Sequence, residues 1–232
     1  MSSAVYVTGT DTGIGKTLAS CSLLHALRGQ GLRASGMKPV ASGCTWLDGE
    51  WKNEDALALQ RASNVSANYA DINPFALEHP LAPELAARDA GIDVTLAPIL
   101  AAHAHLAAQA DTVVVEGVGG WAAPLSANLM QADLVRALRM PVVLVVGLRL
   151  GCLSHALLSA RAILSDGMTL MGWIGSHVDP SMERVQDNLV MLQERLPAPC
   201  WGVLPHVPDA DPSAMASQLR VPEKGVREFP LT

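Results

Sequence analysis

The chain has 232 residues, of which 50% are hydrophobic and 16% charged, and 16 basic against 22 acidic side chains give a net charge of −6. This length and composition predict a single domain over 1–232 with a large core, and they exclude a disordered or fibrous protein. No lysine- or arginine-rich run accompanies the negative charge, so we expect neither a nucleic-acid partner nor binding to an anionic membrane surface.

Strand-like and helix-like segments alternate along the chain. The strands are expected at 4–8, 33–38, 111–116, 141–147, 170–176 and 200–204. The helices are expected at 16–29, 53–63, 96–109, 131–138, 153–165 and 182–195. Two of the strands contain unbroken valine-rich runs, which are typical of central parallel strands covered by helices on both faces. The fold class is therefore α/β, a doubly wound, mainly parallel sheet flanked by helices, with an irregular proline-containing tail from about residue 206.

The first predicted strand leads directly into a phosphate-binding turn, which reads GTDTGIGKT over 9–17. In such a turn the backbone N–H groups converge on phosphate oxygens, Lys16 adds a positive charge and the Thr17 hydroxyl can bind Mg²⁺. Thr10 stands where the pattern GxxxxGK(S/T) has its first glycine, so the turn is a variant, and a structural turn with a solvated Lys16 is the alternative. We expect a nucleoside triphosphate, bound by Gly13, Ile14, Gly15, Lys16, Thr17 and Leu18.

Lys38 ends the second predicted strand, before a proline and a Ser-Gly turn. In sheets of this kind ligands bind beyond the carboxyl ends of the strands, so its ammonium group is expected near that of Lys16. Two lysines there would stabilise the negative charge that accumulates during phosphoryl transfer. A solvated lysine at a strand end is the alternative.

Two carboxylates are candidates for binding Mg²⁺. Glu116 directly follows a buried apolar strand and precedes a glycine-rich segment, which is where P-loop proteins place a magnesium-binding acid. Asp55 lies in the first turn of a helix that Asn53 is expected to cap. The structural alternatives are a carboxylate that caps a turn, for Glu116, and one that complements the helix dipole, for Asp55. Mg²⁺ prefers hard oxygen ligands, and Thr17 with Glu116 leaves room for Asp55.

The cysteines and the start of the chain indicate its compartment. The four cysteines are widely separated without zinc-ligand spacing, which is typical of reduced thiols in a cytoplasmic protein. Cys44 and Cys152 lie near predicted ligand loops, but neither has a neighbour that marks a thiolate nucleophile. The first residues lack a secretory signal, and the most apolar run, 141–148, is too short to cross a bilayer. We expect a cytoplasmic protein that uses no nucleophilic side chain.

Five motifs occur in order along nearly the whole chain. They are GTDTGIGKT (9–17), GMKPVASG (36–43), NEDA (53–56), VEGVGGW (115–121) and LRLGC (148–152). Together they closely resemble the dethiobiotin synthetase family, in which the residue at Thr10 is ordinarily threonine. The resemblance implies an ATP-dependent cyclo-ligase of biotin synthesis that converts 7,8-diaminononanoate, CO₂ and ATP into dethiobiotin, ADP and phosphate. The implied route runs through a carbamate and a carbamic-phosphoric mixed anhydride.

The resemblance also implies roles for individual residues. Lys16 would bind the β- and γ-phosphates, and Lys38 would stabilise the carbamate and the transferring phosphoryl group. The implied Mg²⁺ ligands are Thr17, Asp55 and Glu116. The implied substrate contacts are Thr12 and Ser42, together with Gly151, Cys152 and Leu153 of a second subunit in a homodimer with a shared active site. Further nucleotide contacts are expected from Gly117, Val118, Gly119, Ser176, His177, Pro205, His206 and Val207.

Three residues depart from the family's pattern. Ser176-His177 replaces the Asn-Asp pair that reads adenine in better-known members, and Ser154 replaces an asparagine. We therefore predict a relaxed preference among nucleotides.

Two other functions remain open from the sequence. An amide-forming synthetase of the same superfamily would usually carry a glutaminase domain, for which 232 residues leave no room. A regulatory switch ATPase of the chromosome-partitioning type usually has a second lysine early in the loop, near Asp11, and often a basic or amphipathic surface. Neither feature is found in this sequence.

Overall fold

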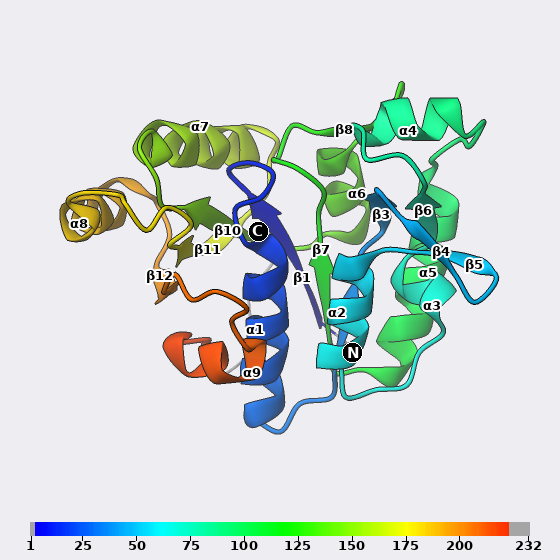
Figure 1. The fold of residues 1–232 in the computed structure, drawn as a ribbon, viewed down its shortest axis with the longest axis horizontal. Coiled ribbons are helices and arrows are strands. Elements are labelled where there is room, and N and C mark those ends of the chain that lie inside the picture. Colours follow the sequence, from blue (N-terminus) through cyan, green and yellow to red (C-terminus); the bar gives the residue numbers. More distant parts are fainter. Residues whose placement is uncertain (1–2, 223–232) are drawn as a thin grey trace.

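A computed structural model describes residues 3–222 and shows one central sheet with helices on both faces (Figure 1). The strands of this sheet are β1 (Ser3–Gly9), β2 (Ala34–Met37), β7 (Thr112–Glu116), β10 (Val142–Gly147), β11 (Leu170–Ser176) and β12 (Cys200–Leu204). Their order is β12-β11-β10-β1-β7-β2, and all neighbours run parallel. The expected doubly wound parallel fold is confirmed.

Helices cover the sheet because its strands are apolar on both faces. Successive strand residues point to opposite sides, so Leu144 packs into one core and its neighbours Val143 and Val145 into the other. One face is covered by α1 (Lys16–Gly29), α2 (Glu54–Ala62) and the short α9 (Pro212–Met215). The other is covered by α5 (Leu96–Gln109), α6 (Gln131–Leu138), α7 (Cys152–Ser165) and α8 (Val185–Arg195).

Several short elements between the main strands and helices were not expected from the sequence. Two are the helices α3 (Tyr69–Ile72) and α4 (Pro83–Asp89). The short strands are β3 (Val40–Ser42), β4 (Thr45–Leu47), β5 (Glu50–Lys52), β6 (Phe75–Leu77), β8 (Pro124–Ser126) and β9 (Leu129–Met130). β3 pairs with β6, while β4 and β5 form a hairpin. Strands of two or three residues are too short for alternation to reveal them.

The bounds of the main elements agree with the sequence analysis to within a few residues. The largest difference is at the helix expected over 182–195, which begins at Val185 because Arg184 takes a left-handed conformation with φ 55°. The tail expected from about 206 contains α9 and a 3₁₀ turn over Ala216–Gln218, and its last part, 223–232, lies outside the described residues. Within the described range, no helix is both long enough and apolar enough to span a membrane.

Candidate active site

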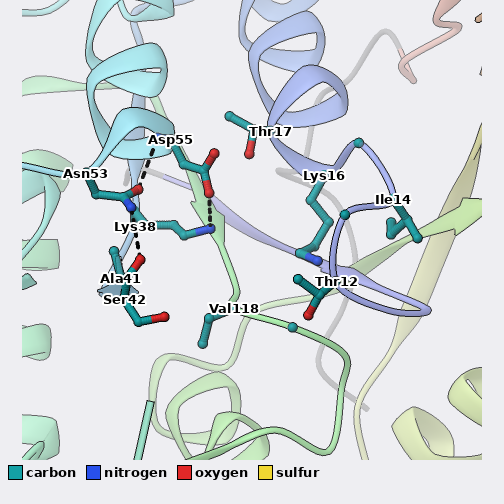
Figure 2. A pocket seen from close by; sticks show the side chains of 13 residues that line it. Thr12, Ile14, Lys16, Thr17, Lys38, Ala41, Ser42, Asn53, Asp55 and Val118 are labelled. Carbon is teal, nitrogen blue, oxygen red and sulfur yellow. Dashed lines mark hydrogen bonds and ion pairs between the residues drawn. The ribbon is translucent and has the colours of Figure 1, made fainter. Parts of the chain in front are cut away.

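A cavity of about 360 Å³ lies at the carboxyl ends of the central strands. Figure 2 shows the loop after β1 on one side of this cavity and the start of α2 on the other, with Lys38 between them. The lining residues are Thr12, Gly13, Ile14, Gly15, Lys16, Thr17, Lys38, Ala41, Ser42, Asn53, Asp55, Val118 and Gly119. The structure thus brings together residues that the sequence analysis took from four separate segments.

The loop between β1 and α1 has the backbone of a phosphate-binding turn. Gly13 and Gly15 have φ values of 71° and 79°, which residues other than glycine rarely adopt. At its end α1 begins, and the free N–H groups of a helix start favour an anion. Lys16 Nζ donates a hydrogen bond to the backbone oxygen of Asp11 at 2.7 Å. Burial, with a smaller contribution from Lys38, lowers the pKa of Lys16 to about 8.

Lys38 is the centre of a buried ionic cluster. Its Nζ lies 2.6 Å from Glu116 Oε1 and 3.1 Å from Asp55 Oδ2, and it also donates to the Gly117 carbonyl at 3.2 Å. Lys38 is 3% exposed and Glu116 is fully buried. Thr17 Oγ1 donates to the same Glu116 oxygen at 3.0 Å. A solvated Lys38, the alternative left open by the sequence, is therefore wrong.

The charges of this cluster stabilise one another. Burial alone would lower the pKa of Lys38, but Glu116 and Asp55 hold it above its ordinary value. For Asp55, burial acts to raise the pKa, and the attraction of Lys38 outweighs it, so the pKa is lowered. Lysine and carboxylate are therefore both ionised at neutral pH, and the cavity presents fixed charges of both signs.

The oxygen atoms around Lys38 fit a magnesium ion. Glu116 Oε2 is buried and has no hydrogen-bond partner among the described residues. It lies in one cluster with the Asp55 carboxylate and the Thr17 hydroxyl, and hard oxygen donors of this kind suit Mg²⁺. The described residues contain no group of three or more His, Cys, Asp or Glu side chains that could hold a metal alone. The set is thus suited to a metal that is shared with phosphates and water.

A polar network that the sequence analysis missed positions this cluster. Asn53 caps α2 as expected, since its Oδ1 accepts from the Asp55 amide at 3.0 Å, and its Nδ2 donates to the Ser42 carbonyl. The backbone N–H of Asn53 donates to Tyr69 Oη, which in turn donates to Asn73 Oδ1. The Nδ2 of Asn73 then donates to the Lys38 carbonyl at 2.7 Å. Buried amides held in this way fix both Lys38 and Asp55.

A second missed residue, Gln131, supports the segment after Glu116. Its Oε1 accepts from Tyr6 Oη at 2.5 Å and from the Val118 amide at 2.8 Å, and its Nε2 donates to the Gly120 carbonyl at 2.6 Å. Gly117 allows this approach, because a Cβ there would lie 2.5 Å from both Gln131 Oε1 and Tyr6 Oη. A glutamine at a helix start carries no sequence signal for such a role.

The remaining predicted residues lie outside the cavity lining. Ser176 is next to the phosphate loop, where a Cβ at Gly15 would lie 2.5 Å from its Oγ. The rings of His177 and His206 meet edge to face at 6.4 Å, and His206 Nδ1 lies 3.2 Å from the His177 carbonyl. Both histidines come from the segments after β11 and β12, as do Pro205 and Val207. Gly151, Cys152 and Leu153 begin α7, and Leu18 belongs to α1.

Comparisons with known proteins agree with this geometry. A family described as an AAA domain matches residues 3–214. An ATP-dependent dethiobiotin synthetase of Xanthomonas oryzae pv. oryzae is 63% identical over 219 residues, which are 94% of this chain and 98% of that protein. One from Xylella fastidiosa is 62% identical over 94% of this chain and 96% of that protein. A solved MinC:MinD cell division complex from Aquifex aeolicus has a TM-score of 0.55 at 15% identity, covers 90% of this chain and 83% of that chain, and shows the fold alone.

Proposed function

The chain belongs to the ATP-dependent dethiobiotin synthetases, and from this membership we propose how its residues divide the work of the reaction. The protein is an ATP-dependent ligase of biotin biosynthesis. The regulatory switch ATPase is not favoured, because the identity to the synthetases exceeds 60% and the likeness to a MinC:MinD complex is one of fold. The observation that carries the assignment of roles is the cavity in which Lys16, Lys38 and Asp55 meet a phosphate loop, with Glu116 buried directly behind Lys38.

The proposed chemistry forms the ureido ring in three steps. One amine of 7,8-diaminononanoate adds to CO₂ and loses a proton, which gives a carbamate. A carbamate oxygen then attacks the γ-phosphorus of ATP, and the bond between the γ-phosphorus and the bridging β-phosphate oxygen breaks. ADP is released, and the product is a carbamic-phosphoric mixed anhydride. The second amine attacks the carbonyl carbon, expels phosphate and loses a proton. No protein nucleophile is needed in this route.

Each lysine has a proposed role that its surroundings support. Lys16 leaves the Asp11 carbonyl and binds the β- and γ-phosphates, while loop amides from Gly13 to Leu18 hold the remaining oxygens. Lys38 stabilises the carbamate and the phosphoryl group in transfer, since its pKa is held high by Glu116 and Asp55 and it stays protonated. Positioned charges of this kind supply most of the catalysis in phosphoryl transfer.

The other cavity residues orient the substrates. Thr12 and Ser42 line the cavity and would contact the diamine or its carbamate. A Cβ at Gly119 would lie 3.6 Å from Thr12 Oγ1, so Gly119 lies against the phosphate loop, and it lines the cavity together with Val118. Mg²⁺ bound by Thr17, Asp55 and Glu116 would neutralise phosphate charge.

A homodimer would complete the site with the start of α7. Gly151, Cys152 and Leu153 lie outside the cavity of their own chain, so they would reach a substrate carboxylate only from a second subunit. Leu150 directly precedes them and is 94% exposed, so an apolar side chain is available there for contact with a second subunit. A helix start there offers free N–H groups to a carboxylate of the partner's substrate.

A cytoplasmic location also remains a prediction.

The experiment that tests this function is an omission series. The purified chain is incubated with Mg-ATP, bicarbonate and 7,8-diaminononanoate, each is left out in turn, and phosphate release is followed together with the mass of the product. Phosphate and a ureido product that both require diamine and bicarbonate are expected. Hydrolysis that needs no diamine and gives no product would instead support the switch ATPase.

A further inference from the structure

An ion pair outside the cavity joins the phosphate loop to the turn after β10. The Arg149 guanidinium bonds Asp11 Oδ2, and these residues are 138 positions apart in the sequence. Their side chains are 40% and 48% exposed, and neither lines the cavity. Arg149 lies in the turn between β10 and α7, a segment that the proposed mechanism does not use within its own subunit.

Asp11 connects this arginine to the phosphate-binding groups. Its Oδ1 accepts from the Thr12 amide at 2.7 Å, and its backbone oxygen accepts from Lys16 Nζ at 2.7 Å. The hydrogen bond from Thr12, with further contributions from Arg149 and His155, lowers the pKa of Asp11. The residue therefore holds a full negative charge one position before the cavity-lining Thr12.

The end of β10, just before the turn that carries Arg149, is packed against the same loop at Thr10 and at Ile14. The Gly147 amide donates to Thr10 Oγ1 at 3.2 Å, and Thr10 N donates to the Val145 carbonyl at 3.0 Å. A Cβ at Gly147 would lie 2.6 Å from Ile14 Cγ2, so the loop and the turn touch without room for a side chain. Contacts at Thr10 and at Ile14 thus fix the loop to the end of β10.

This arrangement matters because Asp11 is in an unfavourable place for an anionic ligand. A carboxylate beside a triphosphate opposes binding unless a cation offsets its charge. In addition, Thr10 and Asp11 occupy the stretch where the usual loop pattern begins with a flexible glycine. The loop needs both a counter-charge and a brace, and the Arg149 guanidinium supplies both.

We propose that Arg149 is a positioning residue of the nucleotide site, which acts through Asp11 by neutralising its carboxylate and holding the phosphate loop in its binding shape. Arg149 touches neither nucleotide nor diamine in this assignment. The inference rests on the proposed use of the loop for ATP. It does not depend on the dimer.

The test is a charge cycle read by binding of Mg-ADP to the full chain in isothermal titration. Arg149→Met is expected to weaken binding about five- to tenfold, because an exposed pair is partly screened by solvent. Asp11→Asn removes the opposing charge and keeps the Oδ1 acceptor for Thr12. In the double variant we expect an affinity within about threefold of the parent. The defect of Arg149→Met is also expected to shrink as salt rises from about 0.05 to 0.5 M, because screening reduces the repulsion.

Controls separate this inference from the proposed function. Arg184→Met removes the arginine of another exposed pair, with Asp187 on α8, and is expected to bind Mg-ADP as the parent does. If the parent chain itself binds no nucleotide, the proposed function fails. If the parent binds and Arg149→Met binds equally well, the positioning role alone is refuted. If the double variant binds Mg-ADP as weakly as Arg149→Met and the defect does not depend on salt, neutralisation of Asp11 is not the cause. Arg149 would then contact the nucleotide directly or only shape the loop, and the proposal would be overturned.

Discussion

Replacing Lys38 by methionine tests the buried ionic cluster most directly. The substitution keeps the length of the side chain and removes the ammonium group that bonds Glu116 Oε1 at 2.6 Å and Asp55 Oδ2 at 3.1 Å. Asp55 is 43% exposed at its side chain and can regain water, whereas Glu116 has no exposed surface. The loss of stability therefore comes from the buried Glu116 carboxylate, which retains, among residues 3–222, only the Thr17 hydroxyl as a hydrogen-bond donor.

The magnitude follows from that burial. Removing one partner of a buried ion pair lowers the free energy of unfolding by about 3–5 kcal/mol. For a chain of this size, a loss of 1 kcal/mol lowers the melting temperature by about 2–4 °C, so we expect a fall of roughly 10 °C. Turnover is expected to fall by about 10²–10³-fold or more, since a positioned charge is lost at the reacting group. Mg-ADP affinity should stay within a few-fold, because Lys16 and the loop amides are unchanged.

Thermal unfolding, phosphate release and Mg-ADP titration measure these three quantities. In Lys38→Met/Glu116→Gln no buried charge is left unpaired, so stability should largely return while turnover does not. Lys52→Met is the matched control, because Lys52 also pairs with two carboxylates, Asp48 and Glu50 at 3.3 Å, but on an exposed hairpin where the loss should be at most about 1 kcal/mol. A Lys38→Met chain with parental turnover would refute the catalytic role, and one with parental stability would refute the cost of the unpaired carboxylate.

Three further predictions concern other parts of the site. The pKa of Lys16 is lowered to about 8, so Mg-ADP affinity should fall as pH rises through about 8, where the amine becomes neutral. Lys16→Gln should bind Mg-ADP weakly at every pH, without this fall in affinity. A fall in affinity near pH 8 that persists in Lys16→Gln would contradict the assignment. Gln131→Leu removes the partner of the Val118 amide and of the buried Tyr6 hydroxyl, while the Gly120 carbonyl still accepts from the Ala123 amide. Chemical denaturation should therefore show a loss of about 3 kcal/mol and steady-state kinetics a raised KM for the diamine, and an unchanged KM would contradict the supporting role. Because Ser176-His177 replaces the usual adenine-reading pair, ATP, GTP and CTP should give comparable turnover rates, and strict use of ATP would contradict this expectation.

Much of the site could be predicted because its chemistry is carried by local motifs placed by a simple topology. Lys16, Lys38 and Glu116 each stand at or just after the end of a parallel strand, and such ends share one edge of the sheet. Asp55 was predictable from the helix that Asn53 caps, although only the structure shows it paired with Lys38.

The supporting residues could not be predicted, because their partners are distant in the sequence. The bond between Tyr6 and Gln131 joins residues 125 positions apart, and the one between Asn73 and the Lys38 carbonyl spans 35. Polar residues of this kind look the same in a sequence whether they face solvent or hold a catalytic loop. The pairing of Arg149 with Asp11 has the same character, since a charged residue after a strand has no fixed partner until the fold is known.

The catalytic cavity and the segments expected to read the base come from different parts of the chain. Every residue that lines the cavity falls between Thr12 and Gly119, whereas Ser176 ends β11 and His177 and His206 follow β11 and β12, in the other half of the sheet. Under the roles proposed above, substitutions in the C-terminal third would alter the choice of nucleotide and leave the bond-forming groups unchanged. The choice of energy source and the chemistry of ring closure would then evolve separately.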